Sequence, residues 1–593
     1  MKHRLLLSIF FSLFVLTTIP GFAQGFLKVS GKKIVDAKGS EIILRGMGLG
    51  GWMLQEPYMM QLSGVAANQG DIKRKIEALI GPEKTATFYD AWLANHCTKS
   101  DIDSMKAWGF NSVRLPMHYN LYTLPVEEEP VRGQQTWLEK GFRMTDSLLS
   151  WCKEAEMYLI LDLHAAPGGQ GNDIAISDRD TTKPSLWQSR ENELKTIALW
   201  RKLAERYAGE KWIGAYDVIN EPNWGFQSAG DKNGCAETGN APLKSLMVEI
   251  TTAIREVDKD HIIIIEGNCW GNNYKGILPT WDNNTVVSFH KYWNDNTTAS
   301  IQQFLDIRDQ YNVPIWLGES GENSNVWYRS AIKLMEQHKI GWAWWPLKKL
   351  GMNNPMEMHI NPAYQQTIAY WKGEGPKPSA EDAFKGLMLL AEASNAVNTS
   401  YQKDVVDAMF RQVKEDKVIP FRQHQIQANN RVYAVDFDLG KIGAAYYSID
   451  SANYWVSNGG KRTQWNKGRV YRNDAVDIEK NRDSLGNGYH VSNMQPTEWL
   501  QYSMDANKGV YELQIHVSTT QPAEYELFIN GIKKGASIKV PSTGEKWTTV
   551  TINNVQLQQG LNQLKLVVKS GTLSLNYFQF NNNKTVRANN KNK

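Results

Sequence analysis

The sequence predicts an α/β protein: a (β/α)8 barrel, then a helical connector, then a C-terminal β-sandwich. Between about residue 40 and residue 350, eight short apolar runs alternate with amphipathic helical stretches. After about residue 430 the pattern changes to short alternating strands, separated by turn residues such as Asn530-Gly531. We favour a barrel over an open doubly wound sheet because the repeated unit occurs eight times.

The eight apolar runs are predicted strands. Ile262–Ile265 is apolar at every position, which is typical of a parallel strand covered on both faces. The runs are Ile42–Gly48, Asn111–Pro116, Met157–His164, Ile213–Pro222, His261–Gly267, Thr285–Trp293, Val313–Gly321 and Gly341–Leu347. The predicted helices between them include Trp137–Ala155, Glu191–Ala208 and Ala241–Val257.

The chain divides into five predicted segments. Residues 1–23 resemble a secretory signal peptide: Lys2 and Arg4 precede an apolar run, and small residues end at Ala23. No later segment reaches the length of a membrane span. We therefore expect a protein that is secreted, either extracellular or periplasmic. The remaining segments are the barrel (24–378), the connector (379–429), the sandwich (430–583) and a tail (584–593).

Composition excludes several functions. A net charge of +4 over 593 residues gives no basic surface for nucleic acid. No CxxC or HExxH motif is present, so we expect no metal site in the barrel. Four cysteines leave three disulfide pairings open. The 22 tryptophans would suit stacking on sugar rings, although large core residues explain many of them. We expect a monomer.

Polar residues close most of the predicted strands, where a parallel barrel carries its catalytic groups. Glu221 ends the fourth run and Glu319 lies near the end of the seventh. Two carboxyl groups are what glycoside hydrolysis requires, one to donate a proton and one to attack the anomeric carbon. A salt bridge at a loop is the alternative for either glutamate alone.

The motifs around these glutamates resemble glycoside hydrolase family 5, a cellulase-like family of (β/α)8 barrels. Six segments match in order: Asn111–Pro116, Leu161–His164, Asp217–Pro222, Phe289–Tyr292, Trp316–Gly321 and Gly341–Lys348. The resemblance implies a retaining β-glycoside hydrolase that needs no cofactor. Glu221 would be its acid/base and Glu319 its nucleophile.

The same resemblance assigns roles to neighbouring residues. Arg114 would hold Glu319 ionised and Tyr292 would donate a hydrogen bond to it. Asn220 would bind the sugar 2-hydroxyl. The residues expected to line the sugar site at −1 are His164, His290 and Trp345, the last as an aromatic floor.

The opening Leu49–Pro57 resembles that of family 5 exo-β-1,3-glucanases, which nominates Glu56 as a contact to the −1 sugar. Two departures are Gly48, where those enzymes carry Asn, and the order Gly171-Asn172. We expect a β-glucan substrate, β-1,3- or β-1,4-linked. Mannan and xylan remain open, as do transglycosylation and a catalytically inactive glycan-binding protein.

The C-terminal segment resembles carbohydrate-binding module family 6. That resemblance implies a polysaccharide clamp of Tyr489 and Trp547, with Asn576 as a hydrogen-bonding partner. A spacer domain that binds no sugar is the alternative. The structural calcium of that family would lack two oxygen ligands, because Tyr433 and Val435 stand in place of glutamates.

Overall fold

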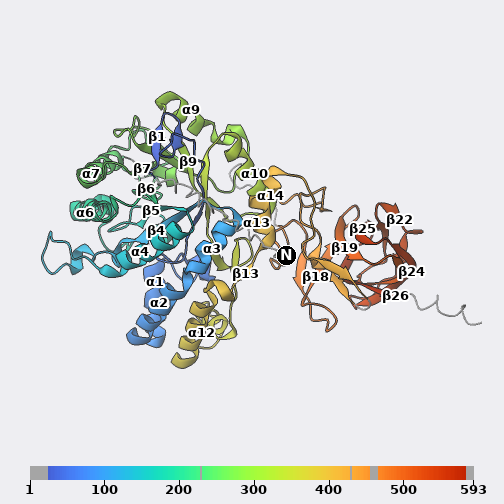
Figure 1. The fold of residues 1–593 in the computed structure, drawn as a ribbon. Helices are drawn as coiled ribbons and strands as arrows, with labels where there is room; N and C mark the ends of the chain where they lie inside the picture. Colours follow the sequence, from blue (N-terminus) through green and yellow to red (C-terminus); the bar gives the residue numbers. More distant parts are fainter. Residues whose placement is uncertain (1–24, 228–229, 428–429, 454–464, 583–593) are drawn as a thin grey trace, which may run out of the picture.

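The computed structural model describes residues 25–227, 230–427, 430–453 and 465–582. Its N-terminal part is a closed barrel of eight parallel strands, with β10 and β3 adjacent (Figure 1). The strands are β3 (Arg45–Gly48), β4 (Ser112–His118), β5 (Tyr158–Ala165), β6 (Ile213–Asp217), β7 (Ile262–Glu266), β8 (Thr285–His290), β9 (Ile315–Gly321) and β10 (Gly341–Trp345). The predicted barrel is confirmed, and each strand falls within one of the eight predicted runs or overlaps it.

The barrel strands change character along their inward faces. Ile160, Ala215 and Ile264 contribute to an apolar cluster inside the barrel. Two residues further along β5 and β6, on the same face, stand Asp162 and Asp217. The interior is therefore apolar at one end and ionisable at the carboxyl end of the strands.

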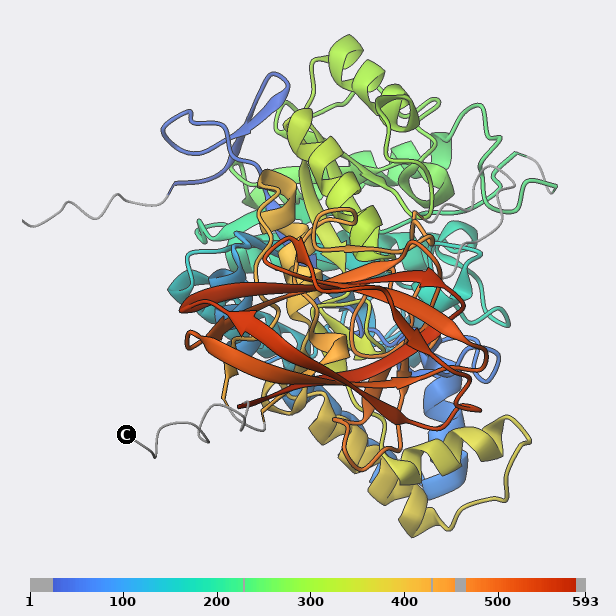
Figure 2. The same cartoon turned by 90° about the vertical axis from the view of Figure 1, so that its right-hand side faces the viewer.

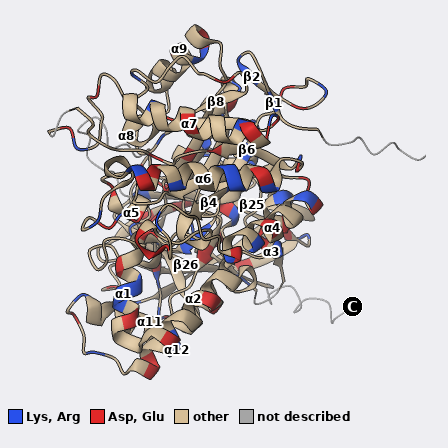
Figure 3. Ribbon diagram, turned by 90° about the vertical axis from the view of Figure 1, so that its left-hand side faces the viewer, with Lys and Arg blue, Asp and Glu red and all other residues tan. Residues whose placement is uncertain are grey.

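Helices cover the outside of the barrel. The three predicted helices form as α4 (Glu139–Glu154), α6 (Arg190–Tyr207) and α7 (Ala241–Val257), beside α3 (Lys99–Trp108), α9 (Gln302–Tyr311) and α10 (Asn325–Gln337). Capping fixes where they begin: the side chain of Ser189 accepts from the N–H of Asn192, and Ser324 caps α10. Acidic and basic residues are interspersed on this side of the molecule (Figure 3).

A second helical layer packs beside the barrel. It contains α1 (Gln69–Ile80), α2 (Pro82–His96), α11 (Pro362–Trp371) and α12 (Ala380–Ala393), which share one apolar cluster. The small sheet of β11 (Lys348–Leu350), β12 (Met356–Met358) and β13 (Ser400–Tyr401) follows the last barrel strand, and α13 (Lys403–Met409) and α14 (Arg411–Lys414) lead on to the module.

The C-terminal module is a sandwich of two mainly antiparallel sheets, as predicted (Figure 2). One sheet joins β14 (His424–Ile426), β16 (Tyr446–Tyr447), β19 (Trp499–Ala506), β21 (Ala523–Ile529), β22 (Ile532–Lys533), β23 (Ile538–Val540) and β25 (Gly560–Ser570). The other joins β15 (Arg431–Tyr433), β17 (Ile478–Lys480), β18 (Tyr489–Met494), β20 (Gly509–Ser518), β24 (Thr548–Leu557) and β26 (Leu573–Asn582). Burial alternates along β21 and β25, which defines the core face.

Two predicted segments, the signal peptide (1–23) and the tail (584–593), lie outside the described residues. β14 lies inside the range predicted for the connector but pairs with β19 of the sandwich. None of the helices in the described part of the chain combines the length and apolar character that a membrane crossing requires.

Candidate active site

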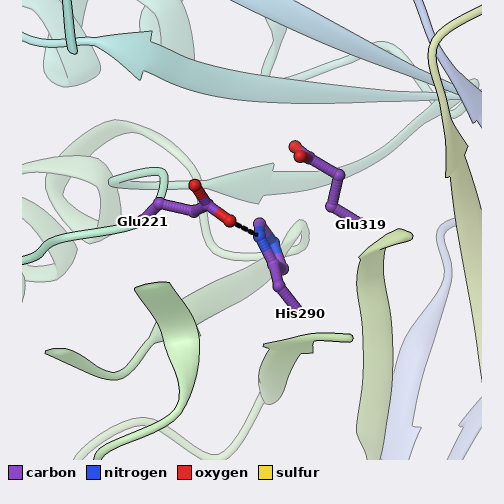
Figure 4. A group of neighbouring side chains, drawn as sticks. All are labelled: Glu221, His290 and Glu319. Carbon is purple, nitrogen blue, oxygen red and sulfur yellow. Dashed lines mark hydrogen bonds and ion pairs between the residues drawn. The ribbon is translucent and has the colours of Figure 1, made fainter. Parts of the chain in front are cut away.

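Glu221 and Glu319 lie close together at the carboxyl end of the barrel. Glu319 is in β9, the seventh barrel strand, and Glu221 is four residues beyond the end of β6, the fourth. One carboxyl oxygen of each, together with a ring nitrogen of His290, lies within 4.8 Å of the others (Figure 4). Retaining glycosidases need carboxyl groups about 5–5.5 Å apart. The spacing of the pair therefore fits a double displacement.

Arg114 occupies the centre of the site and is fully buried. Its guanidinium donates to Asp217 (3.0 and 2.8 Å), to Asn220 (2.8 Å) and to Glu319 (2.8 Å). Asp162 and Glu266 lie 3.2 Å from it. Burial disfavours the cation, but the surrounding carboxylates outweigh that effect and raise the pKa of Arg114. Arg114 is thus a fixed positive charge shared by several acids.

Glu319 receives two hydrogen bonds that aim its carboxylate. Arg114 Nη1 donates to Oε2 and the Tyr292 hydroxyl donates to Oε1, both at 2.8 Å. Donors to a carboxylate stabilise its charged form and restrict its rotation. The contacts expected of Arg114 and Tyr292 are present in the structure.

Glu221 has a different environment. It is 5% exposed, and its backbone adopts a left-handed conformation (φ 44°). Its backbone N–H donates to Glu266 Oε2 at 2.7 Å, which holds the turn in place. Burial, with the charges of Glu319 and Glu266, raises the pKa of Glu221 to about 7, although His290 opposes the shift.

His290 bridges two acids. Its Nδ1 lies 2.6 Å from Glu221 Oε1 and its Nε2 lies 3.1 Å from Glu266 Oε1. Burial disfavours the charged ring, but the two carboxylates raise the pKa of His290 well above its ordinary value. The raised pKa favours the charged ring, and its 2.6 Å contact orients Glu221, which is more specific than the lining role predicted.

These pKa shifts predict the alkaline limit of activity. Above pH 7 the Glu221 carboxyl loses the proton that a general acid must donate, so we expect kcat/KM to fall with an apparent pKa near 7. A pH profile of kcat/KM with an aryl glycoside measures this alkaline limb. Glu221→Gln is the control: its amide cannot titrate, so its residual activity should not fall in this range. A limb retained in Glu221→Gln would assign it to another group.

His164, Asn220 and Trp345 form a connected set. His164 Nδ1 lies 2.8 Å from Asp162 Oδ2, and Asn220 Nδ2 lies 3.3 Å from His164 Nε2. Burial lowers the pKa of His164 to about 3, so the ring is neutral, donates from Nδ1 and accepts at Nε2. Since one amide hydrogen of Asn220 is used here and Oδ1 accepts from Arg114, the second amide hydrogen can meet a sugar hydroxyl.

Trp345 rather than Trp344 belongs to the site. Its ring stacks on His164 with centroids 4.9 Å apart and planes 8° apart. Trp344 is in the core, edge-on to Tyr328. A Cβ atom at Gly48 would lie 2.4 Å from the Trp345 ring. Glycine at this departure from the glucanase pattern is therefore required by the close approach of Trp345.

Glu56 is 7% exposed and lies near both glutamates. Burial first, and then the charges of Glu319, Glu322 and Glu221, raise its pKa well above the ordinary value. Glu322 shares a hydrogen bond with Tyr58, whose hydroxyl accepts from Trp345 Nε1 at 3.1 Å. Glu56 is thus a third buried carboxyl group within reach of the charges of the catalytic pair.

Several residues of the site were not predicted. Asp162, Asp217 and Glu266 are buried, and Tyr58 and Glu322 are partly exposed. Asp217 and Glu266 are the final residues of β6 and β7, so the strand-end argument that found Glu221 could have found them. Burial raises the pKa values of Asp162 and Asp217 well above normal.

A disulfide joins the loops beyond β6 and β7. None of the three complete pairings forms: the structure has one bond, Cys235–Cys269, while Cys97 and Cys152 are buried thiols. Cys269 lies next to Asn268, whose side chain accepts from the N–H of Trp224. The bond therefore links the segment that follows Glu221 to the segment that follows Glu266.

The trio of Glu221, His290 and Glu319 has a spacing that could hold a metal ion. However, His290 already contacts Glu221 and Glu266, and Glu319 accepts from Arg114 and Tyr292. With a guanidinium and an imidazolium beside the pair, proton transfer suits these donors better than cation binding.

Residues 73–351 match the family model for cellulase (glycosyl hydrolase family 5). This segment forms a family 5 glycosyl hydrolase domain. The expected family is confirmed for the barrel, in which the predicted pair of glutamates lies.

Curated relatives match a little under half of this chain. A beta-xylosidase of Phanerodontia chrysosporium is 32% identical over 272 residues, 45% of this chain and 52% of that protein. Endoglucanase C of Acetivibrio thermocellus is 24% identical over 43% of this chain and 84% of that protein. A probable glucan 1,3-beta-glucosidase A of Aspergillus fumigatus is 26% identical over 42% and 56%. The chain thus spans about half the length of the beta-xylosidase and of the glucan 1,3-beta-glucosidase.

Residues 472–580 match the model of carbohydrate binding module family 35. The resemblance to family 6 is therefore not confirmed, whereas the presence of a carbohydrate-binding module is.

In the structure the two rings of the predicted clamp, Tyr489 and Trp547, have different neighbours. Successive side chains of a strand point to opposite faces. In β18 it is His490 that meets the Trp547 ring (5.2 Å), whereas Tyr489 meets Tyr471 (4.9 Å). The two predicted rings line separate clefts.

Asn576 lies on the Trp547 side of the module. Trp547 stacks on His516 (5.6 Å), and His516 Nε2 lies 2.9 Å from Asp483 Oδ2, to which Asn576 Nδ2 also donates (2.9 Å). Asn576 is fully buried, and its Oδ1 has no partner in the described structure. Asn576 is therefore connected to Trp547 through Asp483 and His516, whereas Tyr489 packs against Tyr471.

Proposed function

We propose that the protein is a secreted, retaining β-glycoside hydrolase that cleaves β-glucan polysaccharide. The observation that supports this is the unequal pair of glutamates within 4.8 Å. Glu319 is held by two donors, and the pKa of Glu221 is raised to about 7. A carboxyl group with a raised pKa suits the role of acid, and one that is oriented by hydrogen-bond donors suits the role of nucleophile.

In the first step, Glu319 attacks the anomeric carbon while Glu221 gives its proton to the leaving glycosidic oxygen. The bond from carbon to that oxygen breaks, and an ester bond to Glu319 forms. His290 stays hydrogen-bonded to Glu221 and compensates the negative charge left on it.

In the second step, Glu221 acts as a base and takes a proton from water as the oxygen attacks the same carbon. The ester bond to Glu319 breaks, Glu319 leaves as a carboxylate, and Glu221 is again protonated. Two inversions give net retention. Asn220 would donate its free amide hydrogen to the sugar 2-hydroxyl, and Trp345 would support the sugar face.

The proposal of a β-glucan, β-1,3- or β-1,4-linked, is supported by two relatives that are named as a glucan 1,3-beta-glucosidase and an endoglucanase. The buried Glu56 beside the pair supports a glucanase-type −1 site. A second candidate substrate is a β-xyloside, since one relative is named beta-xylosidase. Product analysis on laminarin, barley glucan, cellulose, mannan and xylan separates these, and release of monosaccharide alone would indicate exo action.

The mechanism predicts a rescue pattern. Glu221→Ala should lower kcat/KM on polysaccharide by about 10³-fold, because an alkoxide leaving group needs a proton. An aryl glycoside with an acidic phenol should lose far less, and azide should restore turnover by forming a β-glycosyl azide. Rates and ¹H NMR of the product anomer measure both effects. An α-configured azide would contradict double displacement.

Two other functions are outcomes of the same assays. Products longer than the donor would show that a sugar hydroxyl replaces water at the second step. Binding of a polysaccharide without release of reducing sugar would indicate a glycan-binding protein with an inactive barrel.

A further inference from the structure

A cleft of about 520 Å³ lies where the barrel and the module meet. Gln61, Glu357 and Tyr401 line it from the barrel side, and Arg469, Tyr471 and Tyr489 line it from the module. We propose that this cleft binds further sugar units of the polysaccharide whose scissile bond lies between Glu221 and Glu319. The proposal rests on the proposed function and extends the substrate site across both domains.

The two walls of the cleft are locked together by buried polar contacts. Asn473 of the module donates to Asp404 Oδ2 (2.7 Å) and to the carbonyl of Asn323 (2.8 Å). Asn325 in turn donates to the Asn473 carbonyl (3.1 Å) and to Asp474 Oδ1 (3.0 Å). Because all of these groups are buried, separating the two domains would break their hydrogen bonds. The cleft is therefore a fixed feature of the fold.

The module wall carries partly exposed aromatic rings. Tyr489 and Tyr471 have ring centroids 4.9 Å apart and planes inclined at 45°. The Tyr471 hydroxyl lies 2.5 Å from Asp436 Oδ1, which fixes the ring. Tyrosines present an apolar face to a sugar ring and lose little conformational entropy on binding.

Polar groups complete the lining. Lys480 is the direct cross-strand neighbour of Tyr489 and is exposed. Glu357, on the opposite wall, is partly exposed and accepts from Gln402 at 2.6 Å. Aromatic faces beside hydrogen-bonding groups are what a sugar chain requires, with apolar C–H faces and hydroxyl edges.

A chain of side chains connects this cleft to the catalytic pair. Trp345 donates to the Tyr58 hydroxyl, and Tyr58 shares a hydrogen bond with Glu322. The buried Lys349 is attracted by the charges of Glu322 and Glu357 and repelled by that of Arg469. Leu350, the next residue of β11, lines the cleft, so this series of contacts runs from Trp345 to the residues of the cleft wall.

Substrate length provides the test. The wild type is first tested on laminari-, cello- and xylo-oligosaccharides. In the series that it cleaves, kcat/KM is then measured for the hexasaccharide and for the disaccharide. Tyr489→Ala removes one stacking face, so the ratio of hexasaccharide to disaccharide kcat/KM should fall about 10-fold. Tyr447→Ala is the matched control: it is an exposed module tyrosine outside the cleft and should keep the wild-type ratio.

An unchanged ratio in Tyr489→Ala, or an equal loss on both lengths, would overturn the inference. If the wild type cleaves none of the three series, the proposed function fails, and calorimetric titration of the wild type with the three hexasaccharides tests the cleft. Binding that weakens about 10-fold in Tyr489→Ala, and not in Tyr447→Ala, would then support the cleft. Binding that is absent or independent of Tyr489 would overturn it.

Discussion

Glu319→Ala is expected to abolish hydrolysis, with a loss in kcat of at least about 10⁴-fold, because no ester intermediate can form. The fold should persist, since Arg114 keeps its contacts to Asp217 and Asn220 and the site loses a charge from a crowded acidic cluster. Steady-state rates on an aryl glycoside and on polysaccharide, with thermal unfolding of the same samples, measure both.

Tyr292→Phe is the graded comparison for Glu319→Ala. It removes one of the two hydrogen bonds to Glu319 and leaves the nucleophile, so about a 10-fold loss is expected. A Glu319→Ala variant with wild-type activity would refute the assignment of the nucleophile.

Arg114→Met should destabilise the protein by about 3–5 kcal/mol at pH 8, because several buried carboxyl groups lose their shared cation. Arg45→Met is the matched control. Arg45 also comes from a barrel strand and pairs with Glu336 (2.6 and 2.9 Å), but the pair is partly exposed and should contribute about 1 kcal/mol or less. Urea unfolding of both variants gives the comparison.

The effect of Arg114→Met should depend on pH. Without the cation, the pKa values of Asp162 and Asp217 rise further above the ordinary 3.8 of an aspartate. An acid with a raised folded-state pKa stabilises the fold below about pH 4 and loses that contribution as the pH rises. The gap between Arg114→Met and the wild type should therefore be smaller at pH 4.5 than at pH 8. A gap that widens towards low pH would contradict this.

The barrel and its catalytic pair could be predicted because the signals are local. Each strand is a short apolar run with its own turn residues, and Glu221 and Glu319 stand at fixed places relative to strands four and seven. The contacts of Arg114 and Tyr292 with Glu319 followed from the family resemblance, and both hold in the structure.

The errors and omissions concern side chains brought together by distant parts of the chain. Tyr489 and His490 are adjacent, and only the strand register decides which of them faces Trp547. The position of Glu266 at the end of a strand could have been read from the sequence, but its contacts with His290 and Glu221 join distant parts of the chain. The single bond Cys235–Cys269 could not be chosen from the sequence, because it depends on how the two loops are placed.

The buried contacts of Asn473 with Asp404 and Asn323 bear on how such a protein can be divided or recombined. A sandwich joined by a free linker is an interchangeable accessory, whereas this one supplies hydrogen-bond partners to the segment just after the nucleophile strand. Barrel and sandwich should consequently melt in one cooperative transition. Any exchange of sandwiches between proteins would have to carry Asn473 and Asp474 with it, or redesign the partners left behind.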